Sequence, residues 1–229
     1  MVKITRKLTP YNFTQMTNKR NMWIIIHYVG AVSTAKNNAY YFYNNDLRGK
    51  KNAASANYFV DENEIWQVVK DTDAAWHIGG ATKYYNSARN NNSIGIEMCC
   101  KKDDKGEFYF EEQTIKNTIA LTRALKKKYG IPIERIARHF DCTKKLCPKP
   151  WCLDESKWIN FLNEVQKEES EMADLPEHSI TEKCNKIKEV MNIDDNTIRY
   201  WGYYKYGVPL IDKAYQVCLD AEKWRNQNK

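Results

Sequence analysis

Short apolar runs alternate with segments of helical periodicity through the first 168 residues of the chain. Apolar runs bounded by polar turns predict strands at 23–28, 55–60, 64–69, 93–98 and 136–139. The helical spacing of apolar residues predicts helices at 34–46, 111–129 and 154–166. This alternation indicates an α/β fold, a mixed central β-sheet flanked by helices. We expect strand 23–28 to lie centrally and helix 111–129 to cover one face of the sheet.

A polar, charge-dense segment, residues 169–178, divides the chain. It contains Pro176 and predicts a linker, so residues 1–168 form one domain. Helical periodicity returns at 180–191 and 210–224, and five aromatic residues lie between Tyr200 and Tyr206. We therefore expect residues 179–229 to form a small helical C-terminal module. Its aromatic residues either make the module's own core or lie exposed for binding.

Composition narrows the class of protein. The chain has 229 residues, and no apolar run approaches the ~20 residues that a membrane span needs. The basic N-terminal residues are not followed by a hydrophobic stretch, so we expect no signal peptide. The seven cysteines are an odd number, which favours reduced thiols over a disulfide framework.

Positive charge is concentrated in the first domain. Residues 1–170 hold 27 Lys and Arg against 19 Asp and Glu, whereas residues 171–229 hold nine against ten. A basic domain suits an anionic partner, either nucleic acid or an anionic cell-wall polymer. The same balance also describes a lysine-rich, solvated surface, so charge alone does not choose the partner.

The segment from His139 to Cys147 carries the clearest chemistry. It places an imidazole and a thiol eight positions apart, with Lys145 two residues before the thiol. Zn²⁺ accepts both kinds of ligand in a tetrahedral shell, but two ligands do not complete a site. His27 ends an apolar run that predicts a buried strand, and it can supply the third. Three protein ligands with an open fourth position describe a catalytic metal site.

A second signal lies in strand 93–98. Side chains alternate between the faces of a strand, so Gly95 and Glu97 point to one face, and Gly95 keeps that face open. A carboxylate there is either paired structurally or works beside the metal. His77 follows an aromatic residue, Trp76, and such a histidine is more often structural or in contact with substrate than a metal ligand.

Five segments, in this order, carry a resemblance to a known family: 25–28 (Ile-Ile-His-Tyr), 55–61 (Ser-Ala-Asn-Tyr-Phe-Val-Asp), 75–79 (Ala-Trp-His-Ile-Gly), 92–97 (Asn-Ser-Ile-Gly-Ile-Glu) and 139–148. Together they resemble the zinc-dependent N-acetylmuramoyl-L-alanine amidases of the type-2 family. That family includes phage endolysins and bacterial autolysins and is related to the peptidoglycan-recognition proteins. The resemblance covers roughly residues 20 to 165 and does not reach the C-terminal module.

The resemblance implies a role for each matching position. The zinc ligands are His27, His139 and Cys147, the catalytic pair is Glu97 and Lys145, and the substrate contacts are Trp76, His77 and Asn57. The implied reaction is hydrolysis of the amide between N-acetylmuramic acid and L-alanine in peptidoglycan. A phage endolysin is the implied context, made in the host cytoplasm and released through a holin-type lesion. Residues 179–229 would then bind the cell wall.

Two positions depart from the family pattern. Lysozyme-like phage amidases carry a catalytic tyrosine where this chain has Ala56, so Glu97 must carry more of the chemistry. Many relatives have histidine where this chain has Asn57, and the role of that histidine is lost or replaced here.

Three alternatives stay open at this point. His139 with Cys142, Cys147 and Cys152 could close a structural zinc site, although this leaves His27 without a purpose. The chain could be a non-catalytic peptidoglycan-binding protein, but such proteins typically lack the third ligand, which is present here. A nucleic-acid-binding protein would fit the positive charge of the first domain and the clustered aromatic residues, but the five ordered motifs argue against it. We therefore expect peptidoglycan as the partner, with anionic cell-wall polymers as a further one and no nucleic acid.

Overall fold

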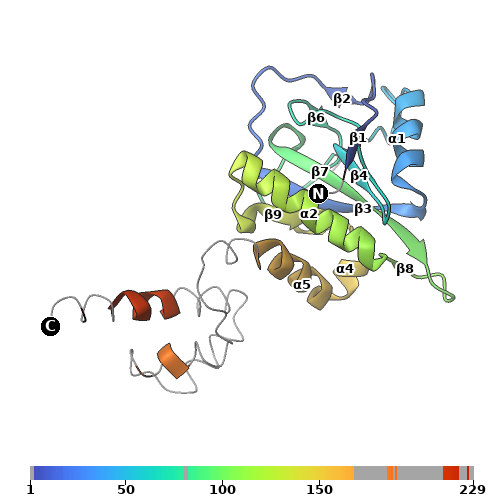
Figure 1. The fold of residues 1–229 in the computed structure, drawn as a ribbon. Helices are drawn as coiled ribbons and strands as arrows, with labels where there is room; N and C mark the ends of the chain where they lie inside the picture. Colours follow the sequence, from blue (N-terminus) through green and yellow to red (C-terminus); the bar gives the residue numbers. More distant parts are fainter. Residues whose placement is uncertain are drawn as a thin grey trace. The chain divides into compact units, whose positions relative to one another are not determined.

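The computed structural model describes residues 3–79, 82–167, 185–187, 189, 214–221 and 226 (Figure 1). The chain separates into two compact units, Met1–Met172 and Ala173–Lys229. In the second unit, the described residues are helical, and Ile187 and Tyr215 are buried. The predicted linker and the aromatic segment between Tyr200 and Tyr206 lie outside the described residues, so the division of the chain at 169–178 and the C-terminal module stay predictions.

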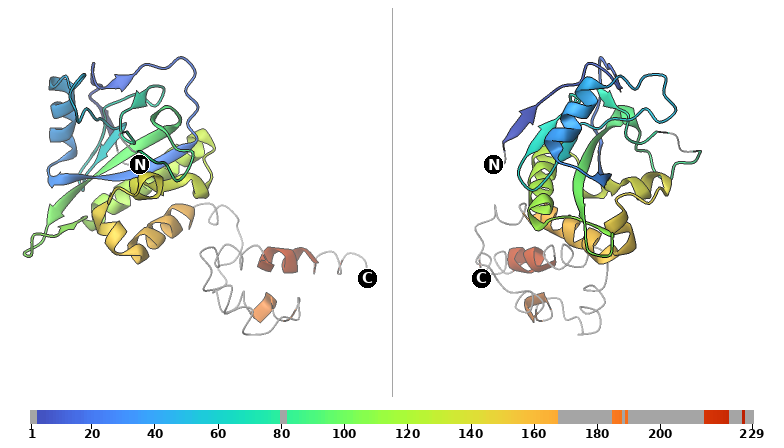
Figure 2. Two further views of the ribbon diagram at one scale, coloured as in Figure 1. Left: turned by 180° about the vertical axis from the view of Figure 1, so that it is seen from behind. Right: turned by 90° about the vertical axis from the view of Figure 1, so that its right-hand side faces the viewer.

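A mixed β-sheet forms the centre of the first unit, as predicted. Its strands lie in the order β1 (Ile4–Arg6), β5 (Ile65–Gln67), β4 (Tyr58–Val60), β7 (Ser93–Lys102), β3 (Trp23–Val32) and β9 (Ile136–Arg138). Strand β8 (Phe108–Tyr109) pairs antiparallel with the end of β7, and β2 (Phe13–Thr14) and β6 (Ala74–Ala75) form a separate pair. The two longest strands, β3 and β7, run side by side in parallel through the unit (Figure 2).

The position of the His27 strand differs from the prediction. Strand β3 has a neighbour on each side, but it is second from one edge of the sheet rather than central. The short strand β9 is followed directly by helix α3, and β9 is the edge strand of the sheet on that side of β3. The sheet extends instead through β4, β5 and β1 on the far side of β7.

In the described part of the first unit, five α-helices pack around the sheet: α1 (Ala35–Asn44), α2 (Glu112–Tyr129), α3 (His139–Thr143), α4 (Lys149–Leu153) and α5 (Glu155–Gln166), with 3-10 turns at Asn90–Asn92 and Ile133–Arg135. Helix α2 ends as predicted at Gly130, whose φ of 61° is the left-handed conformation that glycine adopts without strain. None of the helices in the described part of the chain is both long enough and apolar enough to cross a membrane.

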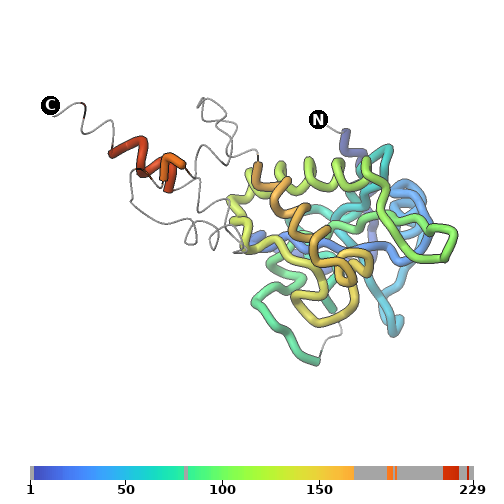
Figure 3. Tube along the Cα trace, turned by 90° about the horizontal axis from the view of Figure 1, so that it is seen from below, coloured from blue at the N-terminus to red at the C-terminus, as the bar shows by residue number. Residues whose placement is uncertain are grey.

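Helices α2 and α5 lie side by side on one face of the sheet (Figure 3). Their buried side chains, among them Leu121, Leu125 and Phe161, pack with Ile24 and Ile26 of β3 and with neighbours on β7. Because strand side chains alternate, the residues between these positions point to the opposite face. That opposite face carries His27 and Glu97, so the covered side stabilises the sheet and the other side holds the chemistry.

Candidate metal centre and active site

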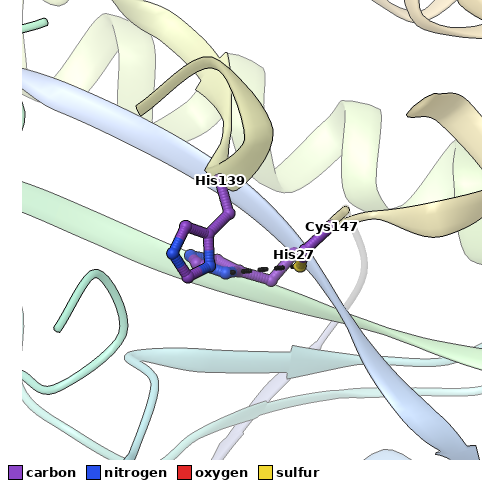
Figure 4. A group of neighbouring side chains, drawn as sticks. All are labelled: His27, His139 and Cys147. Carbon is purple, nitrogen blue, oxygen red and sulfur yellow. Dashed lines mark hydrogen bonds between the residues drawn. The ribbon is translucent and has the colours of Figure 1, made fainter. Parts of the chain in front are cut away.

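The three predicted metal ligands come together in one buried cluster (Figure 4). His27 lies on β3, His139 is the first residue of α3, and Cys147 follows α3 in the loop before α4. Their ligand atoms all lie within 4.8 Å of one another, and Nδ1 of His27 is 3.7 Å from Sγ of Cys147. Nδ1 of His139 is buried and has no hydrogen-bond partner among the described residues. Two imidazoles and a thiol this close together, one imidazole with an unpartnered nitrogen, fit a bound cation.

The protonation states of the imidazoles agree with metal binding. Burial, with a contribution from the neighbouring histidines and Lys145, holds the pKa of His27 well below its usual value. Burial and Lys145 lower the pKa of His139 to about 4. Both imidazoles are therefore neutral near pH 7, which is the form that ligates metal. Burial and Glu97 raise the pKa of the Cys147 thiol, so a thiolate at this position requires a cation beside it.

Two features of the 138–155 segment fix the ligands that it carries. The buried guanidinium of Arg138 forms ion pairs with Asp141 and Glu155 and donates to the Trp151 carbonyl oxygen at 2.9 Å. Trp151 is fully buried and packs against a cluster of aromatic rings, namely Phe110, Trp158 and Phe161. The chain on both sides of Cys147 is thus anchored to the core through polar and aromatic contacts.

Glu97 lies beside the metal cluster. It is the register partner of His27 on the neighbouring strand, and its Oε2 is buried with no hydrogen-bond partner in the described part of the chain. Burial raises the pKa of this carboxyl group to about 7, against the opposing effect of Lys145. A carboxyl group with a pKa near 7 can both accept and return a proton under physiological conditions.

Lys145 is exposed at the mouth of the site. It shares a cavity of about 440 Å³ with His139, and the other lining residues are Gly79, Thr82, Lys83, Tyr85, Thr143 and Lys144. Its positive charge lowers the pKa of Glu97 and of His139. The structure therefore brings five of the predicted site residues, the three ligands with Glu97 and Lys145, to one place.

The other three predicted residues lie differently. Asn57 is fully buried, where its Oδ1 accepts from the Gly95 N–H at 3.0 Å and its Nδ2 donates to the Lys70 carbonyl oxygen at 3.1 Å. Its amide serves the backbone and exposes no atom to a substrate. Trp76 is half-buried and borders a cavity of about 500 Å³ with Thr14, Met16, Ala74, Ile78, Tyr84, Arg89, Asn90 and Asn91, so its ring remains a candidate substrate contact.

His77 is buried and faces His27 rather than the cavities. Its Nδ1 lies 2.9 Å from Nε2 of His27, and its Nε2 lies 3.1 Å from Oγ of Ser93. The expectation that Gly95 leaves this face open is corrected here, because a Cβ at Gly95 would lie 2.6 Å from Cγ of His77. The ring fills the space above the glycine. Ser93 was not predicted as a site residue, since only the folded register brings it to His77.

A closed site built from the other cysteines does not form. Among the described residues, the one group of three or more metal-ligating side chains is His27, His139 and Cys147. The thiol of Cys142 accepts from Nδ2 of Asn86 at 3.4 Å instead. Free thiols are present at Cys99, Cys100, Cys142, Cys147 and Cys152, and Cys184 lies outside the described residues.

Comparisons with known proteins agree with this site. The family model described as N-acetylmuramoyl-L-alanine amidase matches residues 17–150. The N-acetylmuramoyl-L-alanine amidase CwlL of Bacillus licheniformis is 33% identical over 147 residues, which are 62% of this chain and 40% of that protein. The amidase BlyA of Bacillus subtilis (strain 168) is 30% identical over 156 residues, again 62% and 40% of the two chains. The chain thus matches about two fifths of the length of these curated relatives.

Solved structures show the same fold. The structure of PlyL is 25% identical, has a TM-score of 0.59, and is matched over 71% of this chain and 96% of that one. The solution structure of the PlyG catalytic domain is 27% identical with a TM-score of 0.58, over 72% and 94% of the two chains. Both matches cover nearly all of the solved chain and less than three quarters of this one.

Proposed function

Because the chain belongs to the N-acetylmuramoyl-L-alanine amidase family, we propose that it hydrolyses the amide bond between N-acetylmuramic acid and L-alanine in peptidoglycan. The observation that carries this proposal is the buried cluster of His27, His139 and Cys147 with the carboxyl group of Glu97 beside it. The cluster supplies the means of hydrolysis, and the family supplies the identity of the bond.

Zinc is the metal that we propose for this cluster. Two imidazole nitrogens and one thiolate are ligands that Zn²⁺ prefers, and three protein ligands leave a position for substrate or water. A Zn²⁺ ion held by these residues would polarise the substrate carbonyl and make water a stronger nucleophile near pH 7. The unpartnered Nδ1 of His139 and the Nδ1 of His27 are the nitrogens that would hold it.

Glu97 is the residue that we propose to move protons. Its buried Oε2 takes a proton from the attacking water and later returns it to the amine of L-alanine as the amide bond breaks. Lys145, at the mouth of the site, donates a hydrogen bond to the oxyanion that forms on the substrate carbonyl. Because this chain has Ala56 where lysozyme-like phage amidases carry a catalytic tyrosine, Glu97 carries more of the chemistry in this proposal.

The wider context is also a proposal. We propose that the protein is a phage endolysin that reaches the wall through a holin-type lesion, with a bacterial autolysin as the alternative. Peptidoglycan is the proposed partner, and the basic first domain suits anionic wall polymers. The endolysin role is supported by the sequence resemblance alone.

Digestion of purified peptidoglycan tests the proposed reaction. We expect new amino groups on L-alanine without new reducing sugar ends, and mass spectrometry should find lactyl-bearing glycans separated from intact stem peptides. The matched control is Glu97→Gln, which keeps the volume of the side chain. New reducing ends would identify a glycosidase instead. Binding to peptidoglycan with no released fragments would favour the second candidate function, a non-catalytic binding protein.

A further inference from the structure

A chain of hydrogen bonds leads from the metal cluster into the core. It runs from Nε2 of His27 to Nδ1 of His77 (2.9 Å), from Nε2 of His77 to Oγ of Ser93 (3.1 Å), and from Oγ of Ser93 to the Arg89 carbonyl oxygen (2.6 Å). His27, His77 and Ser93 are all buried, so none of these atoms has a ready exchange with bulk water. This series of hydrogen bonds joins His27, a predicted metal ligand, to the backbone through the side chains of His77 and Ser93.

The groups at the two ends of this series of hydrogen bonds determine which partner donates in each bond. Nδ1 of His27 faces Sγ of Cys147 at 3.7 Å, so a metal ion requires the lone pair of that nitrogen. The proton of neutral His27 is then on Nε2, which donates to Nδ1 of His77. His77 must carry its own proton on Nε2 and donates to Ser93. At the far end the Arg89 carbonyl oxygen can only accept, which orients the Ser93 hydroxyl the same way.

Packing holds His77 in this orientation. The N–H groups of His77 and Ile78 both donate to Oδ1 of Asn90, at 3.1 and 2.8 Å, which fixes the backbone. The ring lies directly over Gly95, where any Cβ would lie 2.6 Å from its Cγ. The imidazole therefore has little room to turn away from His27.

We propose that His77 is a positioning residue, which with Ser93 holds His27 in the one tautomer and orientation that can bind the metal. This inference rests on the metal site of the proposed function, but not on the identity of the bond that is cut. A second group that accepts the far N–H of a ligating histidine fixes its tautomer and raises its basicity, and loss of such a group typically costs 10- to 100-fold in metal affinity. Here the accepting group is an imidazole rather than a carboxylate.

Metal affinity of the full chain, measured with Zn²⁺ against a chromophoric chelator, tests the proposal. We expect His77→Phe to bind about 10- to 100-fold more weakly than the wild type, and Ser93→Ala to weaken binding by a smaller factor. His77→Asn offers an oxygen near the position of the lost Nδ1 and should bind more tightly than His77→Phe. The matched control is Tyr84→Phe, which removes a hydrogen bond to the Ile78 carbonyl oxygen in the same segment and should bind as wild type does.

Two spectroscopic readouts separate positioning from loss of fold. In the metal-free wild type, ¹⁵N NMR should find His27 protonated on Nε2, and Ser93→Ala should show a mixture of tautomers. Cobalt-substituted His77→Phe should have an altered visible spectrum.

The proposal is wrong if His77→Phe keeps the metal affinity and the visible spectrum of the wild type, or if His77→Asn binds Zn²⁺ as weakly as His77→Phe. A wild type that binds zinc in this tautomer but cuts no peptidoglycan would overturn the proposed reaction and leave this inference standing.

Discussion

His27 and Glu97 are register partners on the adjacent parallel strands β3 and β7. Paired positions on neighbouring strands put their side chains on the same face, so the sheet itself places a nitrogen ligand beside a carboxylate. Sites built on strands hold their geometry more closely than sites built on loops. Glu97 is therefore the first residue to test for a role in the proposed hydrolysis.

Replacement of Glu97 by Gln should remove most of the activity and leave the metal in place. General acid–base groups typically contribute about 10²- to 10⁴-fold, and glutamine cannot take up a proton. The fold should not suffer, because Oε2 has no hydrogen-bond partner to lose among the described residues. Release of amino groups from peptidoglycan gives the rate, and atomic emission gives the metal content. Wild-type rates in this variant would refute the role of Glu97.

Replacement of Lys145 by Ala should slow turnover without loss of metal. The lost group is a donor to the oxyanion, and removal of one such donor costs about 10²- to 10³-fold in kcat in a well-studied case. Lys144→Ala is the matched control, since Lys144 lines the same cavity and carries the same charge. Equal losses in the two variants would mean that the charge of the cavity matters, rather than a contact made by Lys145.

Replacement of Cys147 by Ser should strip the metal from the purified protein. The change removes the sulfur ligand and leaves two imidazoles, which bind Zn²⁺ far more weakly than a three-ligand site. Cys152→Ser, five residues further along, should retain the metal, because Cys152 is outside the cluster. Metal content after dialysis without chelator measures both. Loss of metal in Cys152→Ser would instead support the alternative structural zinc site, formed by His139 with Cys142, Cys147 and Cys152.

The sequence was enough to predict the elements that have a repeated pattern. Helix α2 has five turns of apolar spacing and a glycine stop, and its ends were predicted within one residue. Strand β1, residues Ile4–Arg6, was not predicted, since three residues are too few to show a period. The place of β3 near an edge was missed because strand order depends on long-range pairing and not on local pattern.

The site divides in the same way. The ligand triad was predictable because the His139-to-Cys147 spacing and the apolar run before His27 are visible in the sequence. The burial of Asn57 and the stacking of His77 over Gly95 were not, because both depend on which loop crosses which strand. Alternation along β7 gave the correct face for Gly95 and Glu97 but could not show what occupies that face.

Replacement of Gly95 by Ala should therefore disturb the metal site through His77, although Gly95 itself is not a metal ligand. A methyl group 2.6 Å from Cγ of His77 must displace the ring or the strand, and overpacking of a core typically costs about 1–3 kcal/mol. We expect a lower thermal midpoint and weaker metal binding. The matched control is Gly79→Ala, where no described atom lies within 4 Å of the added methyl group. Equal behaviour of the two variants would show that His77 moves without consequence.

The last prediction concerns a chain shortened to end at Glu169. The three ligands, Glu97 and Lys145 all precede this point, and the last described helix of the first unit ends at Gln166. We expect the shortened protein to fold, bind metal and cleave soluble muropeptides at the full-length rate. It should lose activity on whole cells, because a wall-binding module raises the effective concentration of the enzyme at an insoluble substrate. Circular dichroism, metal content and the two activity assays measure these outcomes, with the full chain as control.

An unfolded product would mean that residues beyond 169 belong to the first unit. Full activity on whole cells would mean that the C-terminal residues do not target the wall.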